Sequence, residues 1–151
     1  DELLKKWLRD AHIEGYEVVL LDGLALEETE LMLASENLCQ FVMGLYFACD
    51  ETVGARRTLG HAATPYDKLD DSSKTEVDEL VEQIKARNTS DQTRAVQPIV
   101  RPADAPVFAL PNITGFSPTP ERFMATVDTS ANMSKQEMSA PVAKIVAAQL
   151  K

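Results

Sequence analysis

One stretch of the chain places arginine and aspartate at spacings that suit the binding of a phosphorylated ligand. Arg87, Asp91 and Arg94 stand at positions i, i+4 and i+7, so a helix that continues through them presents all three on one face. Two guanidinium groups can hold phosphate oxygens, and the carboxylate between them can accept a hydrogen bond from a sugar hydroxyl. The same spacing fits an exposed Arg–Asp–Arg ion-pair ladder, which needs no ligand. On spacing alone, the ladder is favoured.

Alternating helices and strands are expected to position these residues. Helical periodicity and capping signals predict helices at residues 1–13, Glu27–Leu38, a short segment opened by Cys49 or Asp50, Ser73–Arg87 and Ala140–Lys151. Apolar runs predict strands at Glu17–Asp22, Phe41–Ala48 and Ala105–Leu110. This order predicts an α/β domain with a partial parallel sheet and flanking helices.

Some details of these elements can be tested directly. Ser73 is expected to cap the long helix, with Glu76 as its capping-box partner. Trp7 is expected to lie in the core, and Leu31, Ala34 and Leu38 to share the apolar side of their helix. Residues 111–133 are rich in Pro, Thr and Ser and are expected to be irregular, with one short helix at Glu121–Val127 and Pro141 in the first turn of the last helix.

Composition restricts the class of protein. The 151 residues are 44% hydrophobic and 26% charged, as in a soluble globular domain of ordinary size. No apolar run is long enough to span a bilayer. The net charge of -9 disfavours extensive binding to nucleic acid. Cys39 and Cys49 fit no metal-binding spacing and are expected to be free thiols, so no metal site is expected.

The run from Leu80 to Ala105 resembles the C-terminal part of bacterial-type cytidylate kinases. The residues that carry the likeness are Ile84-Lys-Ala-Arg87, Asp91, Arg94-Ala-Val-Gln-Pro98 and Ala103-Asp-Ala105. Upstream, Tyr16–Gly23 looks like the strand that ends in Ala-Asp-Gly in this family, and Ala48, Glu51, Arg56 and Arg57 match its next strand and helix. The resemblance covers residues 1–110 and implies a P-loop nucleoside monophosphate kinase-like fold, followed by an irregular extension at 111–151.

The resemblance implies roles for individual residues. It places Arg87, Asp91 and Arg94 around the nucleoside monophosphate, as substrate-binding residues. It places Arg56 and Arg57 beside the transferring phosphates, as catalytic residues, where positive charge stabilises the phosphoryl oxygens. A solvated helix end, favoured by the helix dipole, is the alternative for these two arginines.

The chain also departs from the family pattern. Leu24 and Ala25 stand where the family has an Arg-Asp pair, and Asn88 replaces an aspartate. After the last expected strand, the family's Asp-(Ser/Thr)-(Ser/Thr) is replaced by Ala109-Leu110-Pro111. The sequence contains no Gly-x-x-x-x-Gly-Lys-(Ser/Thr) motif to hold ATP phosphates. We therefore expect this chain to be the second half of a larger α/β domain.

Two functions remain open. The first is a non-catalytic structural subunit of a larger protein assembly, of which a mitochondrial ribosome is one candidate. The second is an active CMP or dCMP kinase that uses ATP and Mg²⁺, with its phosphate loop upstream. An intermediate hypothesis is a kinase-like protein that has no activity but still binds CMP or another nucleotide. All of these imply an intracellular protein, mitochondrial or cytoplasmic, that does not enter a membrane.

Overall fold

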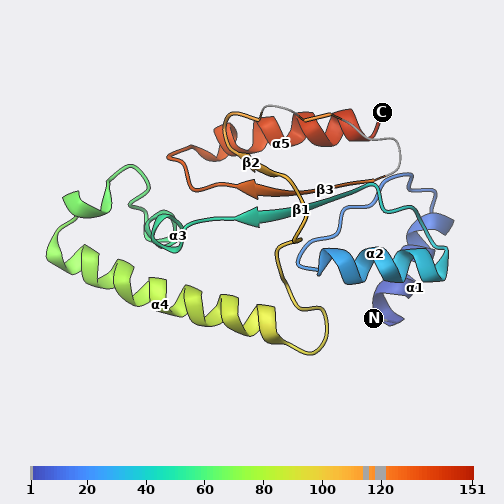
Figure 1. Ribbon diagram of the computed structural model, residues 1–151, viewed down its shortest axis with the longest axis horizontal. Coiled ribbons are helices and arrows are strands. Elements are labelled where there is room, and N and C mark those ends of the chain that lie inside the picture. Colours follow the sequence, from blue (N-terminus) through green and yellow to red (C-terminus); the bar gives the residue numbers. More distant parts are fainter. Residues whose placement is uncertain (1, 114–115, 118–121) are drawn as a thin grey trace.

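A small parallel sheet lies at the centre of the molecule (Figure 1). The computed structural model describes residues 2–113, 116–117 and 122–151. Within them, β1 (Met43–Ala48), β2 (Val107–Ala109) and β3 (Phe123–Asp128) form a sheet in the order β1-β3-β2. Both pairs are parallel, with Leu45 opposite Ala125 and Phe108 opposite Val127. The expected α/β architecture with a small parallel sheet is confirmed.

The central strand is one that the sequence pattern did not predict. A helix was expected at Glu121–Val127, but its described residues from Phe123 onward form β3, which pairs with both other strands. Glu121 itself lies outside the described residues. A strand was expected at Glu17–Asp22, but this segment joins no strand of the sheet. The expected boundary after residue 110 therefore falls between two strands of one sheet.

The helices largely follow the predicted order. They are α1 (Glu2–Ile13), α2 (Leu26–Glu36), α3 (Glu51–Thr58), a 3-10 turn η1 (Tyr66–Lys68), α4 (Asp71–Thr93) and α5 (Lys135–Gln149). The Asp50 carboxylate caps α3 by accepting from the Val53 amide at 3.0 Å. The starts of α3, α4 and α5 are each set by a side chain that satisfies an amide with no partner inside the helix, whereas Ala25 before α2 offers no side-chain cap.

Two helix starts differ from the predicted ones. The Asp70 carboxylate, and not Ser73, caps α4, because it accepts from the Ser73 amide at 2.7 Å. Ser134 and Glu137 form a capping box at the start of α5. Because α5 begins at Lys135, Pro141 lies inside that helix and not in its first turn.

The apolar core is divided into three clusters. Leu8 of α1 packs with Met32 and Leu33 of α2. A second cluster joins α3 to α4, and a third joins the sheet to α5 (Figure 1). Gly44 lets α2 approach β1, since a Cβ there would lie 2.7 Å from the Phe41 ring and 3.2 Å from the Leu26 side chain.

The buried faces of α1 and α2 differ from those expected. Trp7 is half exposed, and the α1 side chains that are buried are Leu8 and Ala11. Leu31 is 71% exposed, whereas Met32 and Leu33 beside it are buried. Among the described helices, none is both long and apolar enough to cross a membrane.

Candidate functional site

Arg57 joins the carboxyl ends of two parallel strands. It lies on α3, which follows β1 almost directly. Its Nη2 donates to the carbonyl oxygens of Thr129 at 2.6 Å and Ala131 at 2.7 Å, just beyond β3. Its Nη1 lies 3.5 Å from the Cys49 Sγ. A guanidinium group that donates to two backbone carbonyls in this way holds the loop after β3 against α3.

The neighbouring Arg56 holds a different loop. Its Nε donates to the Thr64 carbonyl at 2.8 Å and its Nη2 to the Ala62 carbonyl at 3.0 Å. These bonds fold the segment that follows α3 back toward the helix. Both arginines expected to stabilise transferring phosphates therefore donate to backbone oxygens of this chain.

The loop after β3 is tied by further polar contacts. The Ser130 hydroxyl accepts from the Asp50 amide at 2.8 Å, and the Thr129 hydroxyl donates to the Ala48 carbonyl at 3.1 Å. The Asp128 carboxylate accepts from the Ser130 amide at 2.9 Å. Hydrogen bonds from the Ser130 side chain and backbone lower the pKa of Asp128 below its ordinary value. The carboxyl edge of the sheet, where α/β folds commonly bind ligands, is thus an ordered polar network.

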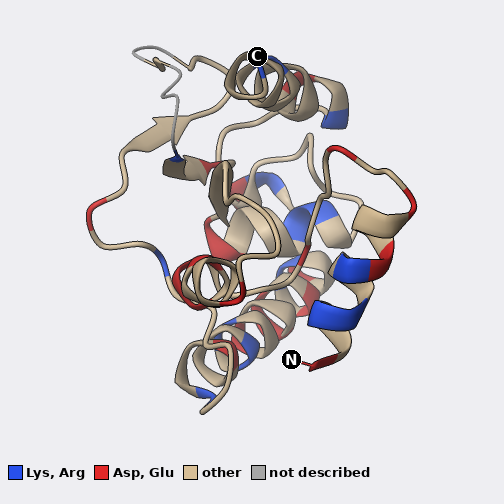
Figure 2. Ribbon diagram, turned by 90° about the vertical axis from the view of Figure 1, so that its right-hand side faces the viewer, with Lys and Arg blue, Asp and Glu red and all other residues tan. Residues whose placement is uncertain are grey.

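Arg87, Asp91 and Arg94 meet one another at the end of α4. The Asp91 carboxylate lies 3.8 Å from the Arg87 Nε and 3.6 Å from the Arg94 Nη1. Helix α4 ends at Thr93, so Arg87 and Asp91 lie on one helical face as predicted. Arg94 lies just beyond the end of the helix. The Arg87 side chain is 84% exposed. This arrangement matches the ion-pair ladder, in a helix on which acidic and basic residues are interspersed (Figure 2).

The two groups of predicted site residues are not joined to each other. Helix α3 packs against α4 in a cluster that reaches as far as Ile84. Asp91 lies seven residues further along α4, or about 10 Å along its axis. Among the described residues, no hydrogen bond or ion pair links Arg56 or Arg57 to the three residues of the ladder.

Gln97 is a residue that sequence reasoning missed. Its side-chain oxygen accepts from the Ala25 amide at 2.8 Å, and its own amide donates to the Glu28 carboxylate at 3.1 Å. The Arg94 Nε donates to the Gln97 carbonyl at 2.5 Å. Gln97 thus ties the end of α4 to the start of α2, at the place where the family resemblance puts a phosphate-binding Arg-Asp pair. No local pattern marks this role, because the partners are about 70 positions away.

Arg122 was missed for the same reason. It forms a two-pronged ion pair with Glu30, in which the Nη2 lies 2.6 Å from Oε2 and the Nε donates to Oε1. This pair joins α2 to the residue just before β3. In the described part of the chain, no three His, Cys, Asp or Glu side chains gather closely enough to hold a metal ion.

Comparison of the chain with protein-family models, with curated proteins and with solved structures finds no significant match.

Proposed function

We propose that the chain works as a non-catalytic structural subunit of a larger protein assembly, with an α/β fold related to the C-terminal part of cytidylate kinases. The observation that carries this proposal is the apolar surface of the N-terminal third. Leu3, Ile13, Leu20 and Leu31 are each at least 71% exposed, and they lie on α1, on α2 and on the segment between them. Exposed apolar surface of this kind is typical of protein–protein contacts.

The arginines favour a structural role over catalysis. A catalytic guanidinium must be free to meet phosphoryl oxygens in the transition state. Arg56 and Arg57 instead donate to carbonyls at 62, 64, 129 and 131. Their bonds hold two loops in place, which is what a scaffold requires.

The strand β3 adds support to the family resemblance. In the family, Asp-(Ser/Thr)-(Ser/Thr) follows the last core strand. From the sequence, Ala105–Leu110 was expected to be that strand. Among the described strands β3 comes last in the chain, and its final residue, Asp128, is followed directly by Thr129 and Ser130. The order Asp128-Thr129-Ser130 therefore fits the family pattern at β3, whereas Ala109-Leu110-Pro111 at the end of β2 does not.

An active CMP or dCMP kinase remains the second candidate. The observation that favours it is the exposure of Arg87, which leaves the ladder accessible to a phosphorylated ligand. In that case Arg87, Asp91 and Arg94 would exchange their mutual contacts for contacts with the nucleotide. ATP and Mg²⁺ would be the cofactors.

Two measurements on the full-length protein separate these functions. The first is sedimentation of the tagged protein from its own cells, in which we expect it in a large particle, with mitochondrial ribosomal fractions as the first to inspect. Leu20→Ser should reduce its share in that particle, whereas Val107→Ser, at a residue 51% exposed on the edge strand β2, should not. The second is ADP formation with CMP, ATP and Mg²⁺. Activity that Arg94→Ala abolishes would overturn the structural proposal.

A further inference from the structure

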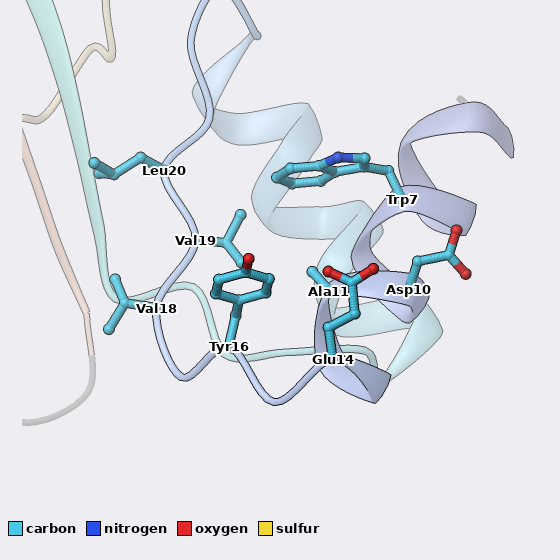
Figure 3. Close-up of a pocket in the computed structure, with 8 residues that line it drawn as sticks. All are labelled: Trp7, Asp10, Ala11, Glu14, Tyr16, Val18, Val19 and Leu20. Carbon is cyan, nitrogen blue, oxygen red and sulfur yellow. The ribbon is translucent and has the colours of Figure 1, made fainter.

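A pocket of about 420 Å³ lies between α1 and the extended segment that follows it (Figure 3). Its lining combines aromatic, acidic and aliphatic side chains. Trp7, Asp10, Ala11 and Glu14 come from α1 and its end, and Tyr16 and Val19 come from the segment after Gly15. None of these residues belongs to the arginine groups described above.

Two aromatic rings border the pocket without being buried. Trp7 is 50% exposed and Tyr16 is 63% exposed. The Trp7 indole extends over the pocket from α1, and the Tyr16 ring stands on the opposite side (Figure 3). The buried Ala11 side chain projects from α1 toward the segment that carries Tyr16 (Figure 3). The faces of such rings carry negative potential and attract cations.

Acidic side chains also line this pocket. The carboxylates of Asp10 and Glu14 line the pocket. Asp10 is paired with Lys6 at 2.7 Å, whereas Glu14 has no ion pair with any described residue. Two other basic side chains of α1 are directed to α2, where the Lys5 Nζ lies 2.8 Å and the Arg9 Nη2 3.7 Å from the Glu36 carboxylate. The pocket thus combines an unpaired carboxylate with two aromatic rings.

We propose that this pocket receives a lysine or arginine side chain of a partner protein. The aliphatic stem of such a side chain would pack on Ala11 and Val19, and its charged end would lie between the rings and the Glu14 carboxylate. This inference rests on the proposed function, and it names the partner's chemistry. We assign the cation to a segment of a partner protein and not to a free small cation. Val18 and Leu20 beside the pocket are 53% and 83% exposed, so they offer apolar contact to the rest of such a segment. The net charge of -9 would also attract a basic partner.

Trp7 provides a direct readout, since it is the one tryptophan in the chain. The probe is a blocked peptide, acetyl-Ala-Leu-Lys-Leu-Ala-amide, titrated into the millimolar range while tryptophan emission is recorded. We expect a saturable change that weakens with added salt. The same peptide with glutamate in place of lysine should produce none. Tetramethylammonium chloride, which carries a cation without a peptide, should bind more weakly than the lysine peptide.

Matched variants assign the binding to the pocket. Glu14→Gln should weaken the lysine peptide about three- to fivefold, and Tyr16→Ala by a similar factor, while Tyr16→Phe keeps the ring and most of the affinity. Glu79→Gln makes the same charge change at an exposed position on α4 and should leave the affinity unchanged.

Several results would overturn the inference. They are the absence of any change with the lysine peptide, an equal response to the glutamate peptide, tighter binding of tetramethylammonium, and an unchanged affinity in Glu14→Gln. If the peptide fails while the protein still sediments in a large particle, the pocket inference falls and the proposed function stands. If the peptide binds while the protein shows CMP kinase activity, the proposed function falls and the pocket remains a cation site.

Discussion

At the level of single residues, Arg56 and Arg57 show how neighbouring guanidinium groups can serve two loops. They are adjacent on α3, yet Arg56 donates to carbonyls on its C-terminal side and Arg57 to carbonyls beyond β3. Both sets of acceptors are backbone oxygens that would otherwise need water or another donor. Loss of these hydrogen bonds should therefore lower the free energy of unfolding.

Replacing Arg57 should destabilise the protein. Arg57→Ala removes a charged donor from the Thr129 and Ala131 carbonyls, and we expect the free energy of unfolding to fall by roughly 1–3 kcal/mol. Arg57→Lys should recover only part of this loss, because an ammonium group cannot reproduce the planar fork. Urea denaturation followed by circular dichroism measures the change.

Arg87→Ala is the matched control. The Arg87 side chain is 84% exposed, and its Nε lies 3.8 Å from Asp91, so its loss should change the free energy of unfolding by no more than about 0.5 kcal/mol. Equal destabilisation by the two replacements would show that Arg57 does not anchor the loop after β3.

The lowered pKa of Asp128 predicts a pH dependence. The hydrogen bonds from Ser130 favour the ionised carboxylate in the folded state. This contribution is fully present above the unfolded pKa, about 3.9 for aspartate, and is lost as pH falls through the lower folded pKa. Asp128→Asn lacks the titrating group. The difference in urea midpoint between wild type and this variant should therefore be constant above pH 5 and shrink below pH 4. A difference that does not change between pH 6 and pH 2 would contradict this.

At the level of elements, helix starts depend on local signals and strands on distant partners, although Asp50 alone among the three side-chain caps was anticipated. Asp50, Asp70 and Ser134 are local signals, because each caps an amide only three residues away. The error at Ser73 arose because Asp70 precedes it and offers an equally good acceptor. The ion pairs of Asp91 with Arg87 and Arg94 also follow from local spacing, although α4 ends at Thr93 and Arg94 lies just beyond it.

The capping box of α5 gives a test at this level. The Ser134 hydroxyl accepts from the Glu137 amide at 3.2 Å, and the Ser134 amide donates to the Glu137 carboxylate at 2.7 Å. Ser134→Ala removes the hydroxyl and should lower the free energy of unfolding by about 1 kcal/mol. Thermal or urea denaturation measures the loss.

Ser139→Ala is the control inside the same helix. Ser139 is exposed and its hydroxyl bonds to the Gln136 carbonyl, so alanine there should be neutral or slightly stabilising. A loss in Ser139→Ala as large as that in Ser134→Ala would mean that the cap does not determine where α5 begins.

The strand β3 could not be predicted from its own residues. Phe123–Asp128 follows a Pro- and Thr-rich stretch, and its apolar residues also suit one face of a short helix. Its strand form is determined by β1, which lies 80 positions earlier in register, and by β2 on its other side. Conversely, Glu17–Asp22 has a strand-like composition but no partner strand in the sheet. Strand pairing of this kind depends on the whole fold and cannot be predicted from the local sequence pattern.

The difference in burial between β3 and the edge strand β2 predicts different losses of stability for the same substitution. Val127 is fully buried between the sheet and α5, so Val127→Ala should cost about 2 kcal/mol through lost apolar burial and a residual cavity. Val107→Ala makes the same change on the edge strand β2, where the side chain is 51% exposed, and should cost less than about 1 kcal/mol. Urea denaturation of both variants provides the comparison, and a larger cost at Val107 would contradict the central position of β3.

At the level of the whole molecule, the apolar core is divided into three small clusters, of which the one under α5 includes residues of the sheet. The α3–α4 cluster, the α1–α2 cluster and the cluster under α5 are each built from a few buried residues. Contacts distant in sequence hold them together, among them Arg57 to Thr129, Arg122 to Glu30 and the Gln149 side chain to the Val42 carbonyl. All three of these contacts use residues from the C-terminal forty or so positions. The pocket beside α1, by contrast, is lined by residues between positions 7 and 20.

This distribution predicts the result of truncation. A chain that ends at residue 110 keeps the region that the sequence resemblance was expected to cover but loses β3, so β1 and β2 have no strand between them. We expect it to unfold without a cooperative urea transition, because the sheet and its α5 cover are removed together. A chain that ends at Gln149 removes only the two residues after α5 and should retain the wild-type transition. A cooperative transition in the shorter chain would show that residues 1–110 fold alone, and that β3 is added to a domain already formed.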